Sequence, residues 1–312
     1  MKTVVIFGGS GFIGQHIIRR IAKIGYRIII PHQQQTNEAK LRLLGVIGQI
    51  IPLRFRSFNE TIIQRQLQKA NVVINLKTLW DEKKISFKDG IFNFNKQLVN
   101  VLVKMNNNKQ FIYFSGLDSD AKECSKRSEM IFRSENYIQK YLSNSIIIKP
   151  GVIVGGGDRF MKALLPLFKI SFFIPLFGSG KAKFQPVFID DISIAVNKII
   201  IKSIMGKHTF ELVGPEIFTY KDFYNYLAVC LDCKRFLVPV PFWIVKIGIS
   251  ILEKTPICPI NSEQLKLFER DNVSSNRYKK FSDLSIEPQN ISEKIKKIIK
   301  KNKIFFIKTK LN

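Results

Sequence analysis

The sequence predicts an α/β fold, in which a doubly wound parallel sheet is followed by a smaller C-terminal α/β lobe. Three observations support this prediction. Short β-branched runs alternate with helical patterns over residues 1–150, a glycine-rich string directly follows the first run, and the alternation stops after Pro150. We therefore divide the chain into a first domain at residues 1–155 and a smaller lobe at residues 156–312.

Six apolar runs in the first domain are predicted strands. They are apolar at successive positions, as expected for parallel strands that are buried between two layers of helices. The predicted strands are Thr3–Phe7, Arg27–Pro31, Ile50–Phe55, Val72–Leu76, Phe111–Ser115 and Ile146–Lys149. Helical patterns fill the intervals, and we expect helices at about 12–24, 36–45, 59–69, 87–105 and 127–142.

The second lobe begins after a glycine-rich link at Gly155–Asp158. The run Phe184–Ile189 predicts a strand that leads into a helix start at Asp190 and Asp191, which we interpret as a cap and packing element and not as paired catalytic carboxylates. The run His208–Val213 predicts a further strand.

Two apolar segments of the lobe are ambiguous. Residues 236–252 hold two prolines and Lys246 and fall short of the roughly 20 residues that span a bilayer, so we expect a buried or interfacial helix. From Asn290 onward a basic amphipathic helix is predicted, which either lies on an anionic surface or packs on its own domain. Its apolar face consists of Ile291, Ile295, Ile298 and Ile299.

The formal net charge of +26 favours anionic partners. An alternative is that many of the lysines form a solvated surface in a chain crowded with Ile, Lys and Asn. Nucleic-acid binding is unlikely, because no platform of aromatic and basic residues is recognisable. The four cysteines are too few and scattered for a disulfide framework, and Cys230 and Cys233 are interpreted as two thiols on a helix. The histidines are too scattered for a metal site.

The glycine-rich string at residues 8–14 follows a strand and opens a helix. Gly8 allows a tight turn, Gly11 allows backbone to approach a pyrophosphate, and Gly14 allows helix and strand to pack closely. The anion would lie at the helix N-terminus. The sequence therefore predicts a Rossmann-type fold that binds a dinucleotide.

The end of the second strand normally selects the 2′ group of the adenosine ribose, by an acid for a free hydroxyl or an arginine for a phosphate. Here Pro31–Gln35 carry neither charge, although Arg56 follows the third strand. NAD(H) and NADP(H) therefore both remain open as the cofactor.

With these motifs in place, the chain resembles the extended, atypical short-chain dehydrogenase/reductases. Within them it is similar to the NAD(P)H-binding accessory subunits of respiratory complex I (NADH:ubiquinone oxidoreductase) and their alphaproteobacterial relatives. The resemblance covers nearly the whole chain. It rests on the glycine string, Leu44–Ile51, Ala70–Leu76, Phe114–Leu117, Ile146–Gly155 and segments from Gly157 onward.

The resemblance implies roles for individual residues in cofactor binding. The loop of Gly8, Ser10, Gly11, Phe12, Ile13 and Gly14 would hold the pyrophosphate. Leu76 and Lys77 would pass under the ribose, Ser115 would face the nicotinamide, and Pro150 to Ile153 would flank its carboxamide. Gln33 stands where an arginine for a 2′-phosphate is usual, and Arg56 where an acid often contacts adenine.

In active members of this family a tyrosine serves as the acid or base, and a lysine four residues later lowers the pKa of the tyrosine. Counting without gaps between Ser115 and the strand at residues 146–150 places these two slots at Arg127 and Ile131. No tyrosine occurs from residue 114 to 136. Arginine is a poor general base and isoleucine cannot hydrogen-bond, so we expect catalysis to have been lost.

The leading hypothesis is a non-catalytic, dinucleotide-binding accessory or assembly subunit of complex I. It would be peripheral to the inner membrane, on the cytoplasmic side in a bacterium or the matrix side in an organelle. Its expected partners are other complex I subunits, with an anionic membrane surface as a further candidate. Strand-like residues start at Thr3, so we expect no leader peptide before the fold. The alternative is an active oxidoreductase or epimerase with a relocated acid/base, whose turnover Ser115→Ala would abolish.

Overall fold

The computed structural model describes residues 1–33, 35–105, 108–117, 125–252 and 261–308, with side chains described up to residue 300. The chain divides into two compact units that are built from interleaved segments. Unit 1 comprises residues 1–150, 189–212 and 275–287, and unit 2 comprises residues 151–188, 213–274 and 288–312.

Unit 1 contains a seven-stranded parallel sheet in the order β11-β6-β5-β4-β1-β2-β3. The expected doubly wound α/β sheet is therefore confirmed. Its strands are β1 (Thr3–Phe7), β2 (Arg27–His32), β3 (Ile50–Arg54), β4 (Val72–Asn75), β5 (Gln110–Phe114), β6 (Ser145–Pro150) and β11 (Lys207–Leu212). The six strands predicted in this region are each found to within about one residue.

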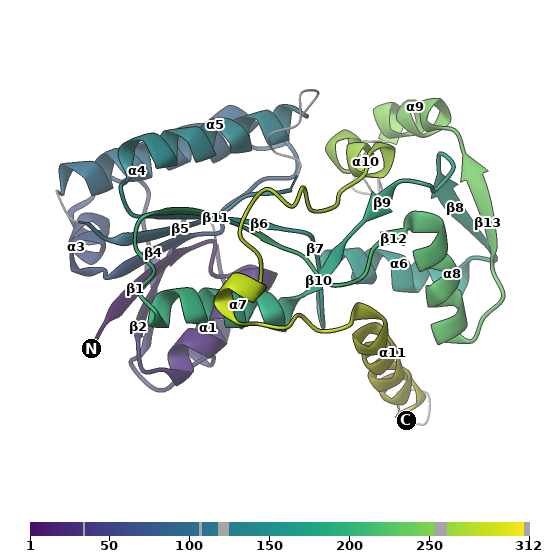
Figure 1. Ribbon diagram of the computed structural model, residues 1–312, viewed down its shortest axis with the longest axis horizontal. Coiled ribbons are helices and arrows are strands. Elements are labelled where there is room, and N and C mark those ends of the chain that lie inside the picture. The colour runs from purple at the N-terminus through teal and green to yellow at the C-terminus, as the bar shows by residue number, and fades with distance from the viewer. Residues whose placement is uncertain (34, 106–107, 118–124, 253–260, 309–312) are drawn as a thin grey trace. The chain divides into compact units, whose positions relative to one another are not determined.

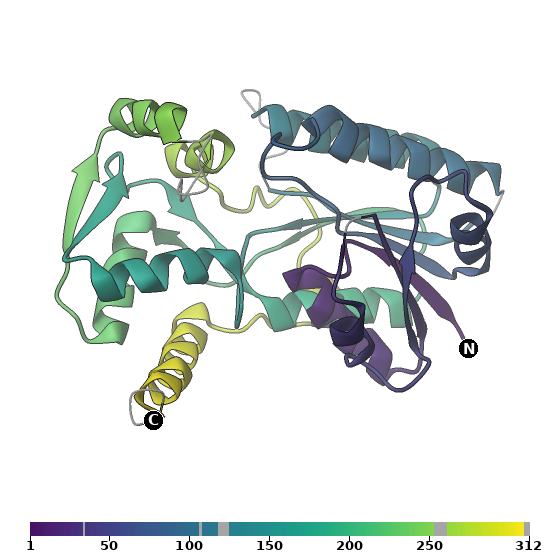
Figure 2. The same ribbon diagram turned by 180° about the vertical axis from the view of Figure 1, so that it is seen from behind.

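Helices cover both faces of this sheet. In Figure 1, α4 and α5 lie on one face and α1 and α7 on the other, and Figure 2 shows the same layers from behind. The helical elements of unit 1 are α1 (Phe12–Lys23), α2 (Glu38–Arg42), α3 (Thr61–Lys69), a π-helical turn at Lys88–Asn93, α4 (Phe94–Lys104), α5 (Lys126–Tyr141), α7 (Ile189–Ile201) and a 3₁₀ turn at Ser282–Leu284. Strands β1 and β4 are buried at every residue, as a strand between two helix layers must be.

The first unit does not end where the sequence predicted the first domain to end. Strand β11 pairs with β6 in parallel register from Ser145 to Pro150, so the segment after residue 188 returns to the first sheet. A bridge between Phe210 and Lys279 attaches residues 275–287 to the same strand. The predicted division at residues 155 and 156 treated the second lobe as continuous, whereas two of its segments belong to unit 1.

Unit 2 is a smaller assembly of two-stranded sheets and helices around an aromatic core that includes Phe168, Phe184 and Phe223. The parallel pairs are β7 with β10 and β8 with β13, and β9 pairs with β12 in antiparallel register. The strands are β7 (Val152–Val154), β8 (Phe173–Phe177), β9 (Lys183–Phe184), β10 (Pro186–Phe188), β12 (Phe218–Thr219) and β13 (Phe236–Val240). The helices are α6 (Arg159–Ile170), α8 (Tyr220–Leu231), α9 (Phe242–Leu252), α10 (Ser262–Glu269) and α11 (Ile291–Lys308).

The basic C-terminal helix packs on its own unit. Ile291, Ile295 and Ile299 of α11 are at most 2% exposed and belong to the core of unit 2, while Lys296 and Lys297 are exposed. Of the two alternatives for this segment, the structure shows packing of the apolar face. Among the described residues, no helix combines the length and apolar character that crossing a membrane requires.

Candidate functional site

The predicted site residues of unit 1 gather at one edge of its sheet. They follow or end parallel strands, and the carboxyl ends of parallel strands meet at the same edge. The strand order reverses direction between β1 and β4, with β2 and β3 on one side and β5 and β6 on the other. Such a switch point is where open α/β sheets bind their ligands.

The turn after β1 has the backbone conformation that the sequence predicted for it. Gly8 has a φ of 74°, a left-handed conformation that favours glycine. A Cβ atom at Gly8 would lie 2.9 Å from the carbonyl carbon of Leu76 and 3.0 Å from the amide nitrogen of Lys77. The backbone that follows β4 therefore passes directly beside the turn, and only glycine leaves room for it.

The helix start at α1 is also built on glycine. A Cβ atom at Gly14 would lie 2.5 Å from the Cα atom of Gly9, so the helix packs against the loop without space for a side chain. Gly9 is itself confined, because its Cβ would lie 3.0 Å from the side chain of Ile30; the sequence argument assigned it no role. The two consecutive glycines, Gly8 and Gly9, were the sequence feature that could have indicated this constraint.

The N-terminus of α1 suits an anion. Gly11 is its cap residue, no side chain in the described part of the chain caps it, and its first turn contains no acid. The backbone amides and the helix dipole at such an end attract negative charge. Ser10 and Gly11 are exposed, and Phe12 and Ile13 are half-buried in the loop and first turn. The residues present therefore fit a pyrophosphate group.

The ends of β2, β3 and β4 are joined by the side chain of Gln33. Its Oε1 atom accepts a hydrogen bond from Lys77 Nζ at 2.8 Å, and its Nε2 atom donates to the carbonyl oxygen of Arg56 at 3.3 Å. Three residues that the sequence assigned to the cofactor are thus brought together. The backbone amide of Arg56 is held in turn by the carboxylate of Glu60, at 2.7 Å.

Lys77 lies at this edge of the sheet and has a lowered pKa. Its Nζ atom lies 3.8 Å from the centroid of the Phe94 ring, and burial lowers the pKa of Lys77 to about 8. A nearby phosphate group would favour the charged form of this amine. The ammonium group is therefore placed to interact with an anionic part of a nucleotide.

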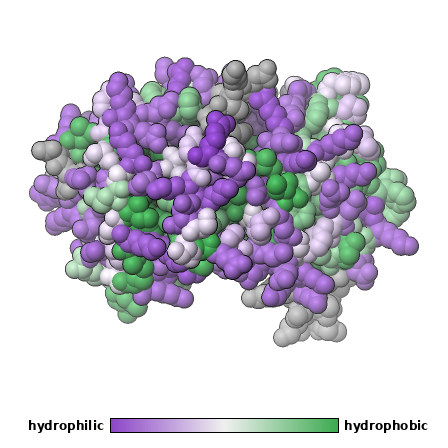
Figure 3. All heavy atoms as spheres, in the orientation of Figure 1, coloured by the Kyte–Doolittle hydropathy of each residue, from purple (hydrophilic) through white to green (hydrophobic). Residues whose placement is uncertain are grey.

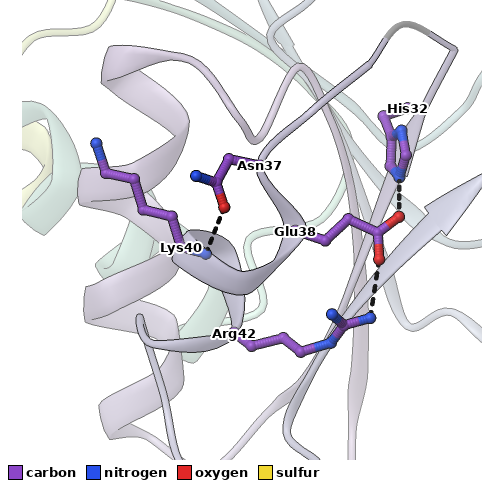
Figure 4. A network of polar contacts seen from close by, with 5 residues as sticks. All are labelled: His32, Asn37, Glu38, Lys40 and Arg42. Atoms are coloured by element: carbon purple, nitrogen blue, oxygen red, sulfur yellow. Dashed lines mark hydrogen bonds and ion pairs between the residues drawn. The ribbon is translucent and has the colours of Figure 1, made fainter.

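A second network, shown in Figure 4, lies just beyond the end of β2. His32 Nε2 lies 3.1 Å from one carboxylate oxygen of Glu38, and Arg42 donates to the other oxygen at 2.8 Å. Asn37 caps the N-terminus of α2 by accepting a hydrogen bond from the amide of Lys40. The sequence analysis did not single out Glu38, although its spacing of four residues from Arg42 on a predicted helix was a signal.

A buried polar cluster, not predicted from the sequence, joins α5, β6 and the residue that follows β5. Lys149 Nζ and a carboxylate oxygen of Glu135 are 3.1 Å apart, with side-chain exposures of 2% and 7%. The hydroxyl of Ser115 donates to the other oxygen of Glu135, and the ring of Tyr278 lies 5.3 Å from Lys149 Nζ. A lysine within the apolar strand Ile146–Pro150 was the available signal, because buried charges require partners.

The two positions that correspond by counting to the tyrosine and lysine slots have different surroundings. Arg127 donates from Nε to the carbonyl oxygen of Leu79 at 2.7 Å and from a terminal nitrogen to the hydroxyl of Thr78 at 3.0 Å. Its guanidinium lies 3.8 Å from the centre of the Trp80 ring. Ile131 is 3% exposed and belongs to the core of unit 1.

The tyrosines nearest to this helix start are engaged elsewhere. Tyr113 is buried, and burial, followed by the negative charge of Glu135, raises the pKa of Tyr113. The hydroxyl of Tyr137 donates to Asn100 of α4 at 2.7 Å, and the Tyr137 ring packs on Tyr141 with 4.5 Å between centroids.

The remaining predicted residues divide between the units. Pro150 ends β6 in unit 1, and Ile153 lies in β7 of unit 2. Cys230 and Cys233 lie at the end of α8 and just after it, and both are half-buried. Cys124 and Cys258 lie outside the described residues. In the part of the chain that the structure describes, no group of three His, Cys, Asp or Glu residues could hold a metal ion.

Comparison with known proteins agrees with this geometry. Residues 4–119 match the model of the NAD dependent epimerase/dehydratase family. The chain is 28% identical over 303 residues to NADH dehydrogenase [ubiquinone] 1 alpha subcomplex subunit 9, mitochondrial, of Arabidopsis thaliana, covering 93% of this chain and 75% of that protein. It is 26% identical to the NADH-ubiquinone oxidoreductase 40 kDa subunit, mitochondrial, of Neurospora crassa, covering 93% and 76%.

Solved structures of the same fold are more distant in sequence. The dTDP-glucose 4,6-dehydratase DesIV from Streptomyces venezuelae, with NAD and TYD bound, aligns with a TM-score of 0.70 at 13% identity over 96% of both chains. The UDP-glucuronic acid 4-epimerase from Bacillus cereus, in complex with UDP-glucuronic acid and NAD, aligns with a TM-score of 0.67 at 14% identity over 96% of this chain and 99% of that chain. These similarities establish the fold.

Proposed function

We propose that this protein is a dinucleotide-binding, non-catalytic accessory or assembly subunit of respiratory complex I, peripheral to the inner membrane. The observation that carries the proposal is the contrast between two helix starts at the same sheet edge. The start of α1 keeps the glycine geometry and uncapped terminus that suit an anion, whereas the start of α5 places a stacked Arg127 and a buried Ile131 at the positions that counting assigns to a catalytic tyrosine and lysine. Relatives named as NADH dehydrogenase subunits match over 93% of the chain.

The surroundings of α5 support the loss of catalysis. Arg127 is held by Leu79, Thr78 and the Trp80 ring, and a guanidinium remains protonated at any ordinary pH, so it supplies no general base. Ile131 lies in the core, where it cannot contact a ribose. The alternative of an active oxidoreductase or epimerase would have to use Glu135, the carboxylate that accepts from the Ser115 hydroxyl, but this carboxylate is buried and paired with Lys149.

The cofactor is a nicotinamide adenine dinucleotide, since the family of the first domain and the fold neighbours are NAD-dependent or NAD-bound. Gly8, Ser10, Gly11, Phe12, Ile13 and Gly14 would hold its pyrophosphate, with Leu76 and Lys77 beside the ribose. Ser115, Pro150 and Ile153 would flank the nicotinamide. Gln33, Arg56 and Lys77 would set the preference between NAD(H) and NADP(H). The bound nucleotide would stabilise the folded state, because it binds that state alone.

The test is affinity purification of the tagged chain from gently solubilised native membranes, with the released nucleotide identified by mass spectrometry. We expect NAD(H) or NADP(H) in a ratio near one per chain, together with complex I subunits. Recovery of the chain free of complex I subunits would contradict the proposal.

Matched glycine variants show whether the nucleotide matters for association. Gly14→Ala places a Cβ 2.5 Å from the Gly9 backbone, whereas Gly156→Ala meets nothing within 4 Å. We expect the first variant to lose the nucleotide and most of the associated subunits, and the second to keep both.

A further inference from the structure

We propose that unit 2 docks on the interface of an anionic lipid bilayer through an exposed apolar surface, which we call the α9–β13 surface. It is defined by Phe172, Phe173 and Phe236 at one end and by Trp243, Ile247 and Ile251 on α9. Each of these side chains is between 53% and 69% exposed. In Figure 3, apolar residues in green reach the surface along the edge of unit 2 where Figure 1 labels β13.

The aromatic end of this surface is a cluster and not a set of scattered side chains. The ring centroids of Phe172 and Phe236 are 5.1 Å apart, and those of Phe172 and Phe173 are 5.5 Å apart. Phe173 and Phe236 are also paired in the parallel ladder of β8 and β13. Single exposed apolar residues are ordinary in folded proteins, whereas a gathered and exposed group marks a surface that another phase or molecule covers.

The helical end is apolar on both of its faces. Inward, the Phe242 ring lies 2.3 Å from where a Cβ atom of Gly178 would be, and Ile249 is 6% exposed, so α9 is fixed to unit 2. Outward, Trp243, Ile247 and Ile251 recur at the spacing of one helix face. The sequence predicted one buried or interfacial helix over residues 236–252. Instead residues 236–240 form strand β13, because they pair with β8, and only α9 is helical, with one buried side and one exposed side.

The two ends are continuous along the chain. The exposed positions of β13 are Phe236, Val238 and Pro239, and α9 begins at Phe242, two residues after the strand ends. Phe242 in turn contacts Gly178, the residue after β8. The strand pair and the helix therefore belong to one structural element of unit 2.

The charges around this surface identify the partner. Basic residues adjoin the surface in the chain, since Lys169 shortly precedes Phe172, Lys234 and Arg235 directly precede Phe236, and Asp232 is the single acid of residues 229–252. Lys246, on the exposed side of α9, pairs with Glu269 at 2.7 Å. Each basic residue near an anionic leaflet contributes favourably to binding, and lysine and arginine stems lie along apolar surface while their charges reach the headgroups.

An interfacial position fits the dimensions. Helix α9 has 11 residues and so a length of about 16 Å at 1.5 Å per residue, about half the thickness of a bilayer core. The helix can lie in the interface but cannot span the bilayer. Tryptophan and other aromatic side chains are enriched at this depth, where an apolar ring and a polar edge are both accommodated.

This surface is distinct from the basic C-terminal helix. The apolar residues Ile291, Ile295 and Ile299 of α11 are buried in the core of unit 2 and cannot enter a membrane without unfolding. Helix α11 therefore offers charge, whereas the α9–β13 surface offers both charge and apolar area. The inference deepens the peripheral membrane position of the proposed function, but its test is separate from complex I, because vesicle binding is a property of the purified chain alone.

The experiment is flotation of the purified full-length chain with vesicles of phosphatidylcholine, alone or mixed with phosphatidylglycerol. We expect the chain to float with the mixed vesicles and much less with phosphatidylcholine alone. We expect the double variant Trp243→Ser/Ile247→Ser to reduce vesicle binding by about tenfold or more. Complete burial of one apolar side chain of this size strengthens binding by more than tenfold, and partial immersion in the interface contributes about half of that free energy. These side chains are exposed, so the fold should be unchanged by circular dichroism.

Two controls separate this surface from general stickiness and from charge. Leu43→Ser/Ile47→Ser removes two exposed apolar residues from unit 1 and should leave flotation unchanged. Lys296→Ser/Lys297→Ser removes exposed charge from α11 and should weaken binding less than the α9 variant. In a Trp80→Phe background Trp243 is the only tryptophan, and its emission should shift to the blue and be quenched by brominated lipid.

Failure of the wild-type chain to bind mixed vesicles would overturn the inference, as would equal flotation of Trp243→Ser/Ile247→Ser and wild type. A third outcome would also overturn the inference: the wild-type chain does not bind vesicles, and Trp243→Ser/Ile247→Ser loses its complex I partners from native membranes. The surface would then contact an apolar protein face and not lipid. If every variant, including the controls, lost its complex I partners, the result would concern the proposed function and not the lipid-binding surface.

Discussion

The first turn of α1 and the first two turns of α5 both start at the carboxyl edge of the unit 1 sheet, yet they differ in what their residues do. At α1, glycines leave space for backbone, and the helix end is left without a side-chain cap. At α5, Arg127 binds the 78–80 segment and Ile131 packs in the core. Under the proposed function, this difference means that a nucleotide site depends on backbone space and a helix terminus, whereas catalysis depends on two side chains that can be replaced without loss of the fold.

The largest expected effect on stability comes from Glu135, in the buried cluster on α5. Glu135→Ala removes the partner of Lys149 and the acceptor of the Ser115 hydroxyl. A buried charge without its partner typically costs about 3–5 kcal/mol, and we expect a loss of this size in the free energy of unfolding, measured by urea titration. The control is Glu129→Ala on the same helix, which removes an exposed ion pair with Arg133 and should cost under about 1 kcal/mol. Equal losses in the two variants would show that the cluster is not structural.

The next effect sharpens the comparison at α1. Gly14→Ala forces a Cβ against the Gly9 backbone, and overpacking of this kind costs about 1–3 kcal/mol. We also expect nucleotide binding to fall below detection in isothermal titration, because the loop and helix start must separate. Unchanged affinity in Gly14→Ala would mean that the nucleotide does not bind at this loop.

A smaller effect is expected at Arg127. Arg127→Ala removes two hydrogen bonds and a stacking contact with Trp80 from a half-buried side chain, and we expect a loss of about 1 kcal/mol. Amide hydrogen exchange should rise at residues 78–80, while nucleotide affinity stays within about threefold of wild type. The exposed neighbour Lys126→Ala serves as the control and should change neither. A large loss of affinity in Arg127→Ala alone would place this residue in the binding site and weaken the contrast between the two helix starts.

A different kind of effect, a pH dependence, is expected from Lys77. Its pKa of about 8 lies below the ordinary value of 10.5, so in the ligand-free protein the unfolded state binds the proton more tightly and stability rises between about pH 8 and 10.5. Nucleotide affinity should run the opposite way, falling above about pH 8 as the ammonium loses its charge. Lys77→Met should remove both slopes and lower affinity at neutral pH by about tenfold or less.

The same variant tests the preference between the two cofactors. If Lys77 contacts a 2′-phosphate, Lys77→Met should weaken NADPH binding more than NADH binding. If it contacts the pyrophosphate, both affinities should fall together. Identical pH profiles in wild type and Lys77→Met would rule out either contact.

Much of this site could be predicted from the sequence, because local patterns determine it. The strands have continuous apolar runs, and the glycines at residues 8, 11 and 14 have a spacing that follows from the turn and helix they form. Counting between Ser115 and the strand at residues 146–150 assigns the tyrosine and lysine slots to Arg127 and Ile131, and this assignment stays a prediction. Those predictions use only neighbours in the chain and the regular geometry of helices and strands.

The parts that could not be predicted depend on contacts between distant segments. The pairing of Glu135 with Lys149 requires α5 to lie against β6, and the bridge formed by Gln33 requires the ends of three strands to converge. Strand β11 joins the first sheet beside β6, so the domain boundary drawn from composition at residue 155 missed the return of the chain. The hydropathy of residues 236–252 could not show that α9 is apolar on both its buried and its exposed face.

The most direct test of the central claim is the nicotinamide absorbance of the purified chain with excess NADH or NADPH, followed after addition of a quinone or a keto-sugar nucleotide as the hydride acceptor. The account predicts tight binding of at least one nucleotide, lost in Gly14→Ala, with no oxidation above the rate in free solution. Acceptor-dependent oxidation with repeated turnover, abolished by Ser115→Ala, would contradict it.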